Sequence, residues 1–188
     1  MSKYIYKNLD KFHKEKNILL ITGLSGSGKS TLSKQFDGIH IELDFFEQCY
    51  QFQTLEEVKN KAGIIFYHYF TEFPFVYKKL KQKELKGNIL GKEIRKFLLY
   101  VLNYCNNDIK NDYILEGVQI YSFLDIEEIK DYPLILIDIH YLKAMLQRIK
   151  RSLKNNERIK DLELFRMFLY YFQENKVIKK FQEGVITM

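Results

Sequence analysis

The sequence has few of the residues that would indicate a disulfide-bonded or metal-bound protein. Its 188 residues include only two cysteines, Cys49 and Cys105, and these lack paired spacing. Neither a disulfide framework nor a zinc site is therefore indicated. The four histidines show no metal-ligand spacing either. We expect a protein of the reducing cytosol.

Long apolar runs and flexible linkers are also missing. No stretch is apolar for long enough to span a bilayer, and the first 16 residues lack the apolar core of a signal peptide. We therefore expect no membrane partner. With two prolines and no Ser/Gly-rich segment, no domain boundary is visible. Residues 1–188 are predicted to form a single α/β domain with a substantial core.

Positive charge is in excess. The sequence contains 30 Lys and Arg against 24 Asp and Glu, which gives a net charge of +6. This balance suits an anionic partner such as a nucleotide, a phosphorylated metabolite or nucleic acid. Nucleic acid is the less favoured of these, because the lysines are spread along the chain.

One short motif carries most of the functional signal. The segment Gly23-Leu24-Ser25-Gly26-Ser27-Gly28-Lys29-Ser30 fits the phosphate-binding loop (P-loop) pattern of glycine, four residues, glycine, lysine and serine or threonine. An apolar run over 17–22 precedes it and reads as a buried parallel strand. Residues 30–36 can open a helix. The motif therefore has the strand–loop–helix setting that it requires.

Each residue type in this loop has a physical role. The glycines allow a tight backbone curl that brings N–H groups close to phosphate oxygens, and the following helix adds its positive end. Lys29 is predicted to reach the β- and γ-phosphates of ATP, and Ser30 to place its hydroxyl on Mg²⁺. The predicted nucleotide-binding residues are Gly23, Ser25, Gly26, Ser27, Gly28, Lys29, Ser30 and Thr31.

Apolar spacing predicts the other elements. Ile5, Leu9 and Phe12 indicate an N-terminal helix within residues 1–15. Strands are expected at 39–44, 112–117 and 132–138, with 184–188 as a weak candidate for a fifth. Helices are expected at 125–130, 141–155 and around 162–172. Residues 45–107 contain no convincing strand and are predicted to form a helical insertion between the second and third strands.

Asp44 is the predicted general base. It follows the apolar positions of the second strand, so its carboxylate is expected near the carboxyl edge of the sheet, where open α/β folds bind ligands. There it would bind an acceptor hydroxyl and accept its proton. Glu42, on the same face of the strand, is the alternative.

Glu116 ends the third predicted strand and is predicted to support Mg²⁺, together with Ser30, or to bind the acceptor. Asp138 ends the next apolar run and is the alternative metal-supporting acid. The strand beside the P-loop strand should supply the metal-supporting acid.

A basic segment supplies the last group of candidate functional residues. Arg148 and Arg151 lie three residues apart and so share a helix face, and Arg158 follows. Guanidinium groups bind phosphate through charge-assisted and often bidentate hydrogen bonds. Residues 141–160 are therefore predicted to form a basic lid, with Arg148 and Arg151 as catalytic residues beside Lys29 and Asp44.

These segments together resemble the P-loop small-molecule kinases, the group around uridine kinase and the nucleoside monophosphate kinases. The resemblance is carried by 23–31, by Leu43-Asp44-Phe45-Phe46, by Ile114-Leu115-Glu116-Gly117 and by Gln147-Arg148-Ile149-Lys150-Arg151. It implies a three-layer P-loop NTPase fold with a parallel sheet of order 2-3-1-4-5, and the use of ATP and Mg²⁺. It also implies that the 45–107 insertion recognises the acceptor.

The predicted function is transfer of the γ-phosphate of ATP to a hydroxyl or phosphate of a small acceptor, with a nucleoside or nucleotide as the favoured acceptor. A polynucleotide kinase and a sugar-nucleotide kinase are the enzymatic alternatives. A regulatory or non-catalytic nucleotide-binding module is the alternative of another class. A GTPase switch is disfavoured because Asn60-Lys61-Ala62-Gly63 and Asn175-Lys176-Val177-Ile178 both lack the guanine-reading Asp.

Overall fold

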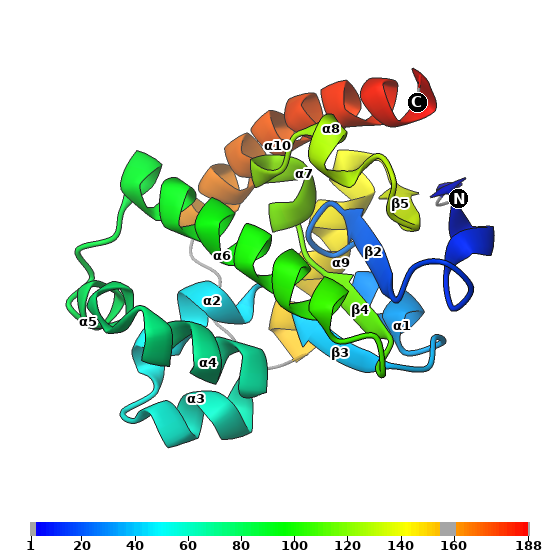
Figure 1. The fold of residues 1–188 in the computed structure, drawn as a ribbon. Helices are drawn as coiled ribbons and strands as arrows, with labels where there is room; N and C mark the ends of the chain where they lie inside the picture. Colours follow the sequence, from blue (N-terminus) through cyan, green and yellow to red (C-terminus); the bar gives the residue numbers. More distant parts are fainter. Residues whose placement is uncertain (1–2, 155–160, 188) are drawn as a thin grey trace.

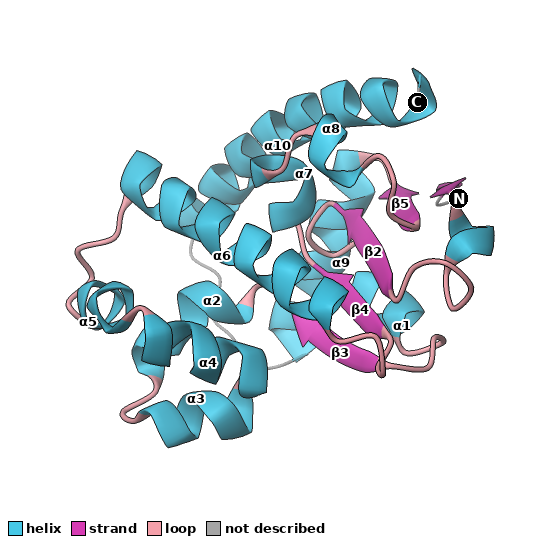
Figure 2. Cartoon of the chain, in the orientation of Figure 1, coloured by secondary structure: helices cyan, strands magenta, loops and turns pink. Residues whose placement is uncertain are grey.

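The protein is an α/β structure built on one five-stranded sheet (Figures 1 and 2). The computed structural model describes residues 3–154 and 161–187, with side chains described outside 151–168. In chain order the elements are β1 (Lys3–Lys7), η1 (Leu9–Lys11), β2 (Ile18–Gly23), α1 (Lys29–Ser33), β3 (Ile39–Glu42), α2 (Phe45–Gln48), η2 (Cys49–Gln51), α3 (Leu55–Lys61), α4 (Ile64–Glu72), α5 (Pro74–Lys81), α6 (Gly87–Asn107), β4 (Tyr113–Glu116), α7 (Gln119–Phe123), α8 (Ile126–Ile129), β5 (Leu134–Asp138), α9 (Tyr141–Lys154) and α10 (Asp161–Thr187).

The strand that precedes the P-loop lies at the centre of the sheet. The strand order is β1-β5-β2-β4-β3, and β2 is buried along its whole length. β2 pairs in parallel with β4 on one side and with β5 on the other, and β3 pairs in parallel with β4. The carboxyl ends of these four strands therefore meet at one edge of the sheet, the edge at which such folds bind ligands.

The predicted parallel order 2-3-1-4-5 is wrong, because the fifth strand comes from the other end of the chain and runs in the opposite direction. Lys3–Lys7 forms β1, antiparallel to β5, where a helix within residues 1–15 was expected. Ile5 packs against the core, while Tyr4 and Tyr6 are exposed. This alternation is that of a strand at a sheet edge, and it overrides the helical spacing of Ile5, Leu9 and Phe12.

The expected strand at 184–188 is also wrong over the described residues, since α10 continues to Thr187. Ile178, Phe181 and Val185 are buried and recur at intervals of three and four, which is the helical period. The Val-Ile-Thr composition of this segment favours a strand, but packing of one helix face decides the outcome.

Helices cover both faces of the sheet. Ile18 and Leu20 of β2 face a large core that includes residues of α6 and α7, and α6 runs across this face in Figure 1. Leu19 and Ile21 point to the other face, where Leu32 and Phe36 from α1 and the turn after it pack. Alternate residues of one buried strand thus belong to two cores, as a strand covered on both faces requires.

The segment between β3 and β4 is helical, and its aromatic rings form part of the large core. The ring of Phe97 in α6 lies 4.9 Å from that of Phe46 in α2, 4.7 Å from Phe66 and 5.0 Å from Tyr69 in α4. These contacts hold α2, the first helix after β3, in a fixed position against α6. The packing of α2 against α6 therefore also fixes the turn that carries Asp44.

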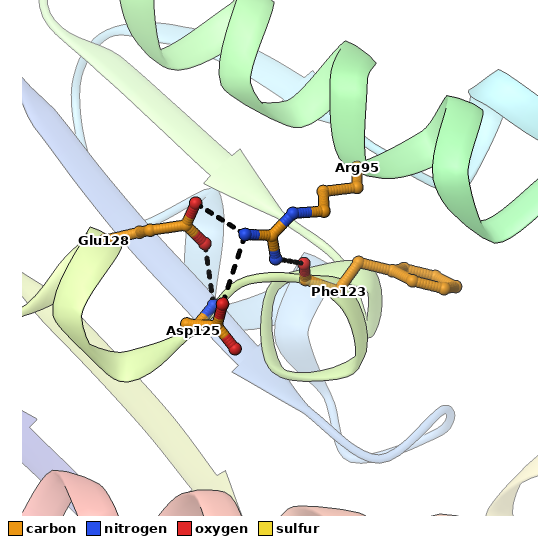
Figure 3. A network of polar contacts seen from close by, with 4 residues as sticks. All are labelled: Arg95, Phe123, Asp125 and Glu128. Carbon is orange, nitrogen blue, oxygen red and sulfur yellow. Dashed lines mark hydrogen bonds and ion pairs between the residues drawn. The ribbon is translucent and has the colours of Figure 1, made fainter.

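Arg95 joins α6 to the segment that follows β4 (Figure 3). Its Nη1 donates to the Phe123 carbonyl at 2.7 Å, and its Nη2 approaches Asp125 at 3.1 Å and Glu128 at 2.8 Å. The Asp125 and Glu128 side chains also form the capping box of α8. One guanidinium group thus fixes the turn between α7 and α8 to the insertion. Among the described helices, none has the length and apolar content needed to cross a membrane.

Candidate phosphate-binding site

The loop between β2 and α1 curls as the motif requires. Gly26 and Gly28 have φ values of 80° and 99°, in the left-handed region that favours glycine. A Cβ at Gly26 would lie 2.7 Å from the Ala144 carbonyl oxygen of α9, so glycine is also required there by close packing. The loop is thus held between the end of β2 and the first turn of α9.

Lys29 begins α1 and lies folded against its own loop. Its Nζ donates to the carbonyl oxygens of Gly23 at 3.0 Å and Leu24 at 3.2 Å, and the residue is buried. The ammonium group therefore lies at the centre of the loop, where the phosphates of a nucleotide would bring negative charge.

Ser30 and Glu116 form the most informative contact of the site. The Ser30 Oγ donates to Glu116 Oε1 at 2.7 Å. Glu116 is only 5% exposed, and its second oxygen, Oε2, is buried without a hydrogen-bond partner among the described residues. An unpaired buried carboxylate oxygen is unfavourable by about 1–3 kcal/mol or more. This oxygen is therefore available to a ligand that supplies positive charge.

The sheet determines the position of Glu116. Ile21 of β2 and Glu116 of β4 are partners in the parallel register, so the acid lies beside the start of the loop. Thr22 Oγ1 donates to the Gly117 carbonyl at 2.8 Å, and the Gly117 amide donates to Ile21 at 3.2 Å. These bonds fix the end of β4 against β2.

A small pocket of about 70 Å³ lies over the loop. It is lined by Ser25, Gly26, Gly28, Lys29, Ser30, Thr31, Glu42, Asp44, Glu116, Gly117 and Arg148. Most of the residues predicted from the sequence to act together thus line one cavity. Of the remaining ones, Gly23 and Ser27 are buried in the loop itself, and the Ser27 Oγ has no hydrogen-bond partner.

Asp44 reaches the pocket from a turn rather than from a strand. β3 ends at Glu42, and Asp44 is the N-cap residue of α2, although its side chain makes no capping bond. Glu42 lies directly opposite Glu116 in the parallel register. Loss of water, with the charges of Glu116 and Asp44, raises the pKa of Glu42, and Lys34 and His40 partly oppose this effect.

Both helices after β5 also contact the P-loop, and Arg148 of α9 lines the pocket. Arg148 of α9 is exposed, and its Nη1 lies 3.3 Å from the Ser25 Oγ. The Tyr171 hydroxyl of α10 donates to the Ser25 carbonyl at 2.8 Å. The side chain of Arg151 and all of Arg158 lie outside the described residues. The spacing of Leu169 and Phe172 indicated a helix here, but no sequence signal pointed to Tyr171 as a residue of the site.

Strand order alone does not choose between Glu116 and Asp138, because β4 and β5 both flank β2. The contacts distinguish them. Asp138 ends β5 opposite Lys3, and its Oδ2 accepts from Gln182 at 3.4 Å. Glu116 is the acid that contacts Ser30 and lines the pocket.

Within the described part of the chain, no group of three or more His, Cys, Asp or Glu side chains could hold a metal ion alone. Ser30 and Glu116 provide two oxygen ligands. That number fits Mg²⁺, which proteins usually hold through one or two side chains while phosphate oxygens and water complete the octahedron.

No protein-family model matches this sequence, and a search of curated proteins gave no significant match.

Proposed function

We propose that the protein is an ATP-dependent phosphotransferase that moves the γ-phosphoryl group to a hydroxyl of a small acceptor. The observation that carries the proposal is the Ser30–Glu116 contact, in which a buried carboxylate with one unpaired oxygen lines a pocket walled by the P-loop. A glycine turn without a nucleotide-binding role would not require a buried acid beside the serine that follows its lysine.

The loop side of the pocket suits the triphosphate. Backbone N–H groups of the loop would hold the phosphates, and Lys29 would exchange its bonds to Gly23 and Leu24 for phosphate oxygens. Ser30 and Glu116 would hold Mg²⁺, which when bound neutralises charge on the phosphate oxygens. Arg148, already at the loop, can approach the transferring group and stabilise its charge.

Asp44 would act on the acceptor. Its carboxylate accepts the hydroxyl proton while the acceptor oxygen bonds to the γ-phosphorus. The bond from that phosphorus to the bridging β-phosphate oxygen breaks, and its electron pair leaves with ADP. Asp44 suits this role because it lines the same pocket as the loop and forms no capping bond.

Nucleotide binding should be coupled to movement of α9 and α10. The pocket holds about 70 Å³, whereas small-molecule sites usually measure about 300–1,000 Å³. The Ala144 carbonyl packs closely against Gly26, and the Tyr171 hydroxyl donates a hydrogen bond to the Ser25 carbonyl. Loosening of both contacts would make room for a triphosphate. Ala144 lies within the segment 141–160 that is predicted to form a lid, and Tyr171 lies beyond it. Action in the reducing cytosol stays a prediction.

The test is transfer of labelled γ-phosphate from ATP–Mg²⁺ to a mixture of small hydroxylated acceptors, with four variants. Lys29→Ala should abolish transfer, and the exposed control Lys34→Ala should not. Asp44→Asn should lower the transfer rate by about 10²–10⁴-fold while ATP binding persists, and Asp37→Asn is its matched control. Far-UV circular dichroism checks that each variant is folded. Normal turnover in Lys29→Ala would refute the proposal, and a full rate in Asp44→Asn would remove the base from it.

A further inference from the structure

A second cavity lies between α6, α10 and the segment of α7 and α8. It is lined by residues within 87–95, 121–126 and 177–181, and we call it the α6–α10 groove. Its volume is about 770 Å³, within the range of about 300–1,000 Å³ that is usual for small-molecule sites. Among the described residues, it shares no lining residue with the pocket over the P-loop. The proposed function therefore leaves this cavity without a role.

The groove has an aromatic wall. Tyr121, Phe123 and Phe181 line it, and the ring centroids of Tyr121 and Phe181 are 6.2 Å apart. Val177, which is 44% exposed, adds apolar surface from α10. Gly91 allows α6 to approach Phe123 closely, since a Cβ there would lie 3.0 Å from the ring. Aromatic and apolar surface around a cavity favours a ligand with an aromatic body.

Arg95 holds one side of the groove in place (Figure 3). Its guanidinium group joins α6 to the Phe123 carbonyl and to the carboxylates of Asp125 and Glu128. Within the described lining, Asp125 is the only acid, and its charge is paired with Arg95. The turn between α7 and α8 is thus fixed before a ligand binds, which reduces the cost of ordering the site.

Two lysines give the groove positive charge. Lys92 of α6 and Lys180 of α10 both line it and are exposed. Across the residues that the structure describes, neither lysine takes part in an ion pair. The first turn of α6 contains no acidic residue and no side-chain cap, so its positive end adds to this charge. Positive charge beside an aromatic wall is complementary to an aromatic anion.

We propose that the α6–α10 groove is a regulatory site for a small aromatic anion of the aryl carboxylate or aryl phosphate class. The body of the ligand packs against Tyr121 and Phe123. Its anionic group pairs with Lys92 and Lys180, and this links α6 to α10. The site goes beyond the proposed function and does not depend on it.

Such a link would oppose nucleotide binding. α10 carries Tyr171, whose hydroxyl donates to the Ser25 carbonyl of the P-loop. One turn later, Glu174 accepts a hydrogen bond from the Tyr121 hydroxyl. A ligand that joins α10 to α6 favours this position of α10, in which the P-loop pocket holds only about 70 Å³. The regulatory part of the inference rests on the proposed function, because it requires ATP to bind at the P-loop.

The first experiment measures binding of three probes by calorimetric titration. 2-Naphthoate and 2-naphthyl phosphate carry the two anionic groups, and 2-naphthylmethanol is their neutral counterpart. One ammonium group about 5 Å from the anion favours it by about fourfold at the dielectric constant of water, about 80. We therefore expect at least one anion to bind about fourfold or more tightly than the alcohol. An alcohol that binds as tightly as both anions would overturn the proposal.

The second experiment locates the probe. Lys92→Ala and Lys180→Ala should each weaken 2-naphthoate binding by about fourfold and leave binding of the alcohol unchanged. Lys179→Ala is the matched control, because Lys179 is an exposed neighbour on α10 that does not line the groove. Equal 2-naphthoate affinities in the Lys179 and Lys180 variants would contradict the site.

The third experiment measures the Kd of ATP–Mg²⁺ with and without 2-naphthoate. The probe should raise this Kd by about fivefold or more. Combining Lys92→Ala with Lys180→Ala should reduce the rise at the same probe concentration. An unchanged Kd in the native protein would overturn the regulatory role. A full rise in the double variant would show that the probe competes at the P-loop, which would overturn the site.

The two proposals fail in different ways. Absence of ATP–Mg²⁺ binding would refute the proposed function and the regulatory role, while lysine-dependent binding of 2-naphthoate would still support the site. Normal ATP–Mg²⁺ binding without binding of either anion would refute the site and leave the phosphotransferase intact.

Discussion

Replacing Glu116 with glutamine should stabilise the ligand-free protein and weaken its response to ATP–Mg²⁺. In the part of the chain that the structure describes, the buried Oε2 has no hydrogen-bond partner, and Glu42 lies directly opposite on β3. Like charges at facing positions of neighbouring strands are unfavourable. Glutamine retains an oxygen to accept the Ser30 hydroxyl and replaces the unpaired anionic oxygen with an amide that can donate toward Glu42.

The size of the effect follows from these contacts. An unpaired buried polar atom is unfavourable by about 1–3 kcal/mol, and the amide recovers part of this, so about 1 kcal/mol is a reasonable gain. In a protein of this length that gain raises Tm by about 2–4 °C. ATP–Mg²⁺ at about 100 times its Kd would stabilise the native protein by about 2.7 kcal/mol, or about 5–10 °C. The variant should lose most of this shift.

The assay is thermal unfolding of the native protein and of Glu116→Gln, each without ligand, with ATP alone and with ATP–Mg²⁺. The order of the two Tm values should reverse between the ligand-free and the Mg²⁺-containing samples. Asp138→Asn is the control, since Asp138 also ends a strand beside β2 but contacts Gln182 instead of Ser30. A Glu116→Gln protein that melts below the native protein without ligand, or that keeps the full ATP–Mg²⁺ shift, would refute the reasoning.

Three further predictions concern the lid, pH and the core. Tyr171→Phe removes the hydroxyl bond to Ser25 and weakens the hold of α10 on the loop by about 0.5–1.5 kcal/mol, so ATP should associate faster in stopped-flow measurements; an unchanged rate would contradict a gating role. Folding raises the pKa of the Glu47 carboxyl above its ordinary value of 4.5, because burial and the charge of Asp44 disfavour the ionised form. The contribution of Glu47 to the free energy of unfolding is therefore fully present below pH 4.5 and is lost as the pH rises through the folded pKa. Glu47→Gln should therefore be more stable than the native protein at pH 7 and equal to it below pH 4.5 in urea titrations, and a constant difference would refute this. Phe97→Ala should reduce the free energy of unfolding by about 3–5 kcal/mol, measured by denaturant titration, and a loss below 1 kcal/mol would show that the aromatic core collapses around the gap.

The predictions from sequence were most successful where burial is uniform. The apolar runs before the P-loop and at 132–138 are strands, because continuous burial on both faces leaves a pattern that no helix face imitates. They failed at both ends of the chain. Ile5, Leu9 and Phe12 have helical spacing, yet Ile5 lies on a strand and Leu9 on a 3-10 helix. Residues 3–7 form a strand because they pair with the otherwise free edge of β5. That partner lies more than a hundred residues away along the chain, so the spacing of neighbouring residues cannot reveal it.

The residues of the site likewise divide into those that a sequence pattern predicted and those that no pattern indicated. Ser30, Asp44 and Glu116 were predicted from the motif and the strand ends, and Arg148 from the face of a basic helix. All four line one pocket, because the parallel strands end at one edge and α9 packs against the P-loop. Tyr171 could not be predicted in this way. Its contact with the loop depends on where α10 packs, and that is decided by buried residues elsewhere on the helix. The roles of all these residues stay predictions until transfer is measured.

The position of β1 has a consequence for how the molecule is made. Lys3–Lys7 is synthesised well before Leu134–Asp138, its only strand partner in the described sheet. At about 5–20 residues per second, the ribosome takes roughly 6–25 s to cover that distance. During translation the unpaired backbone of Lys3–Lys7 and the apolar side chain of Ile5, which packs against the core in the folded protein, therefore remain open to chaperones or to other chains. The sheet cannot be completed until β5 has been synthesised. A fusion that slows release of the amino-terminal segment Lys3–Lys7 should therefore reduce the yield of correctly folded protein.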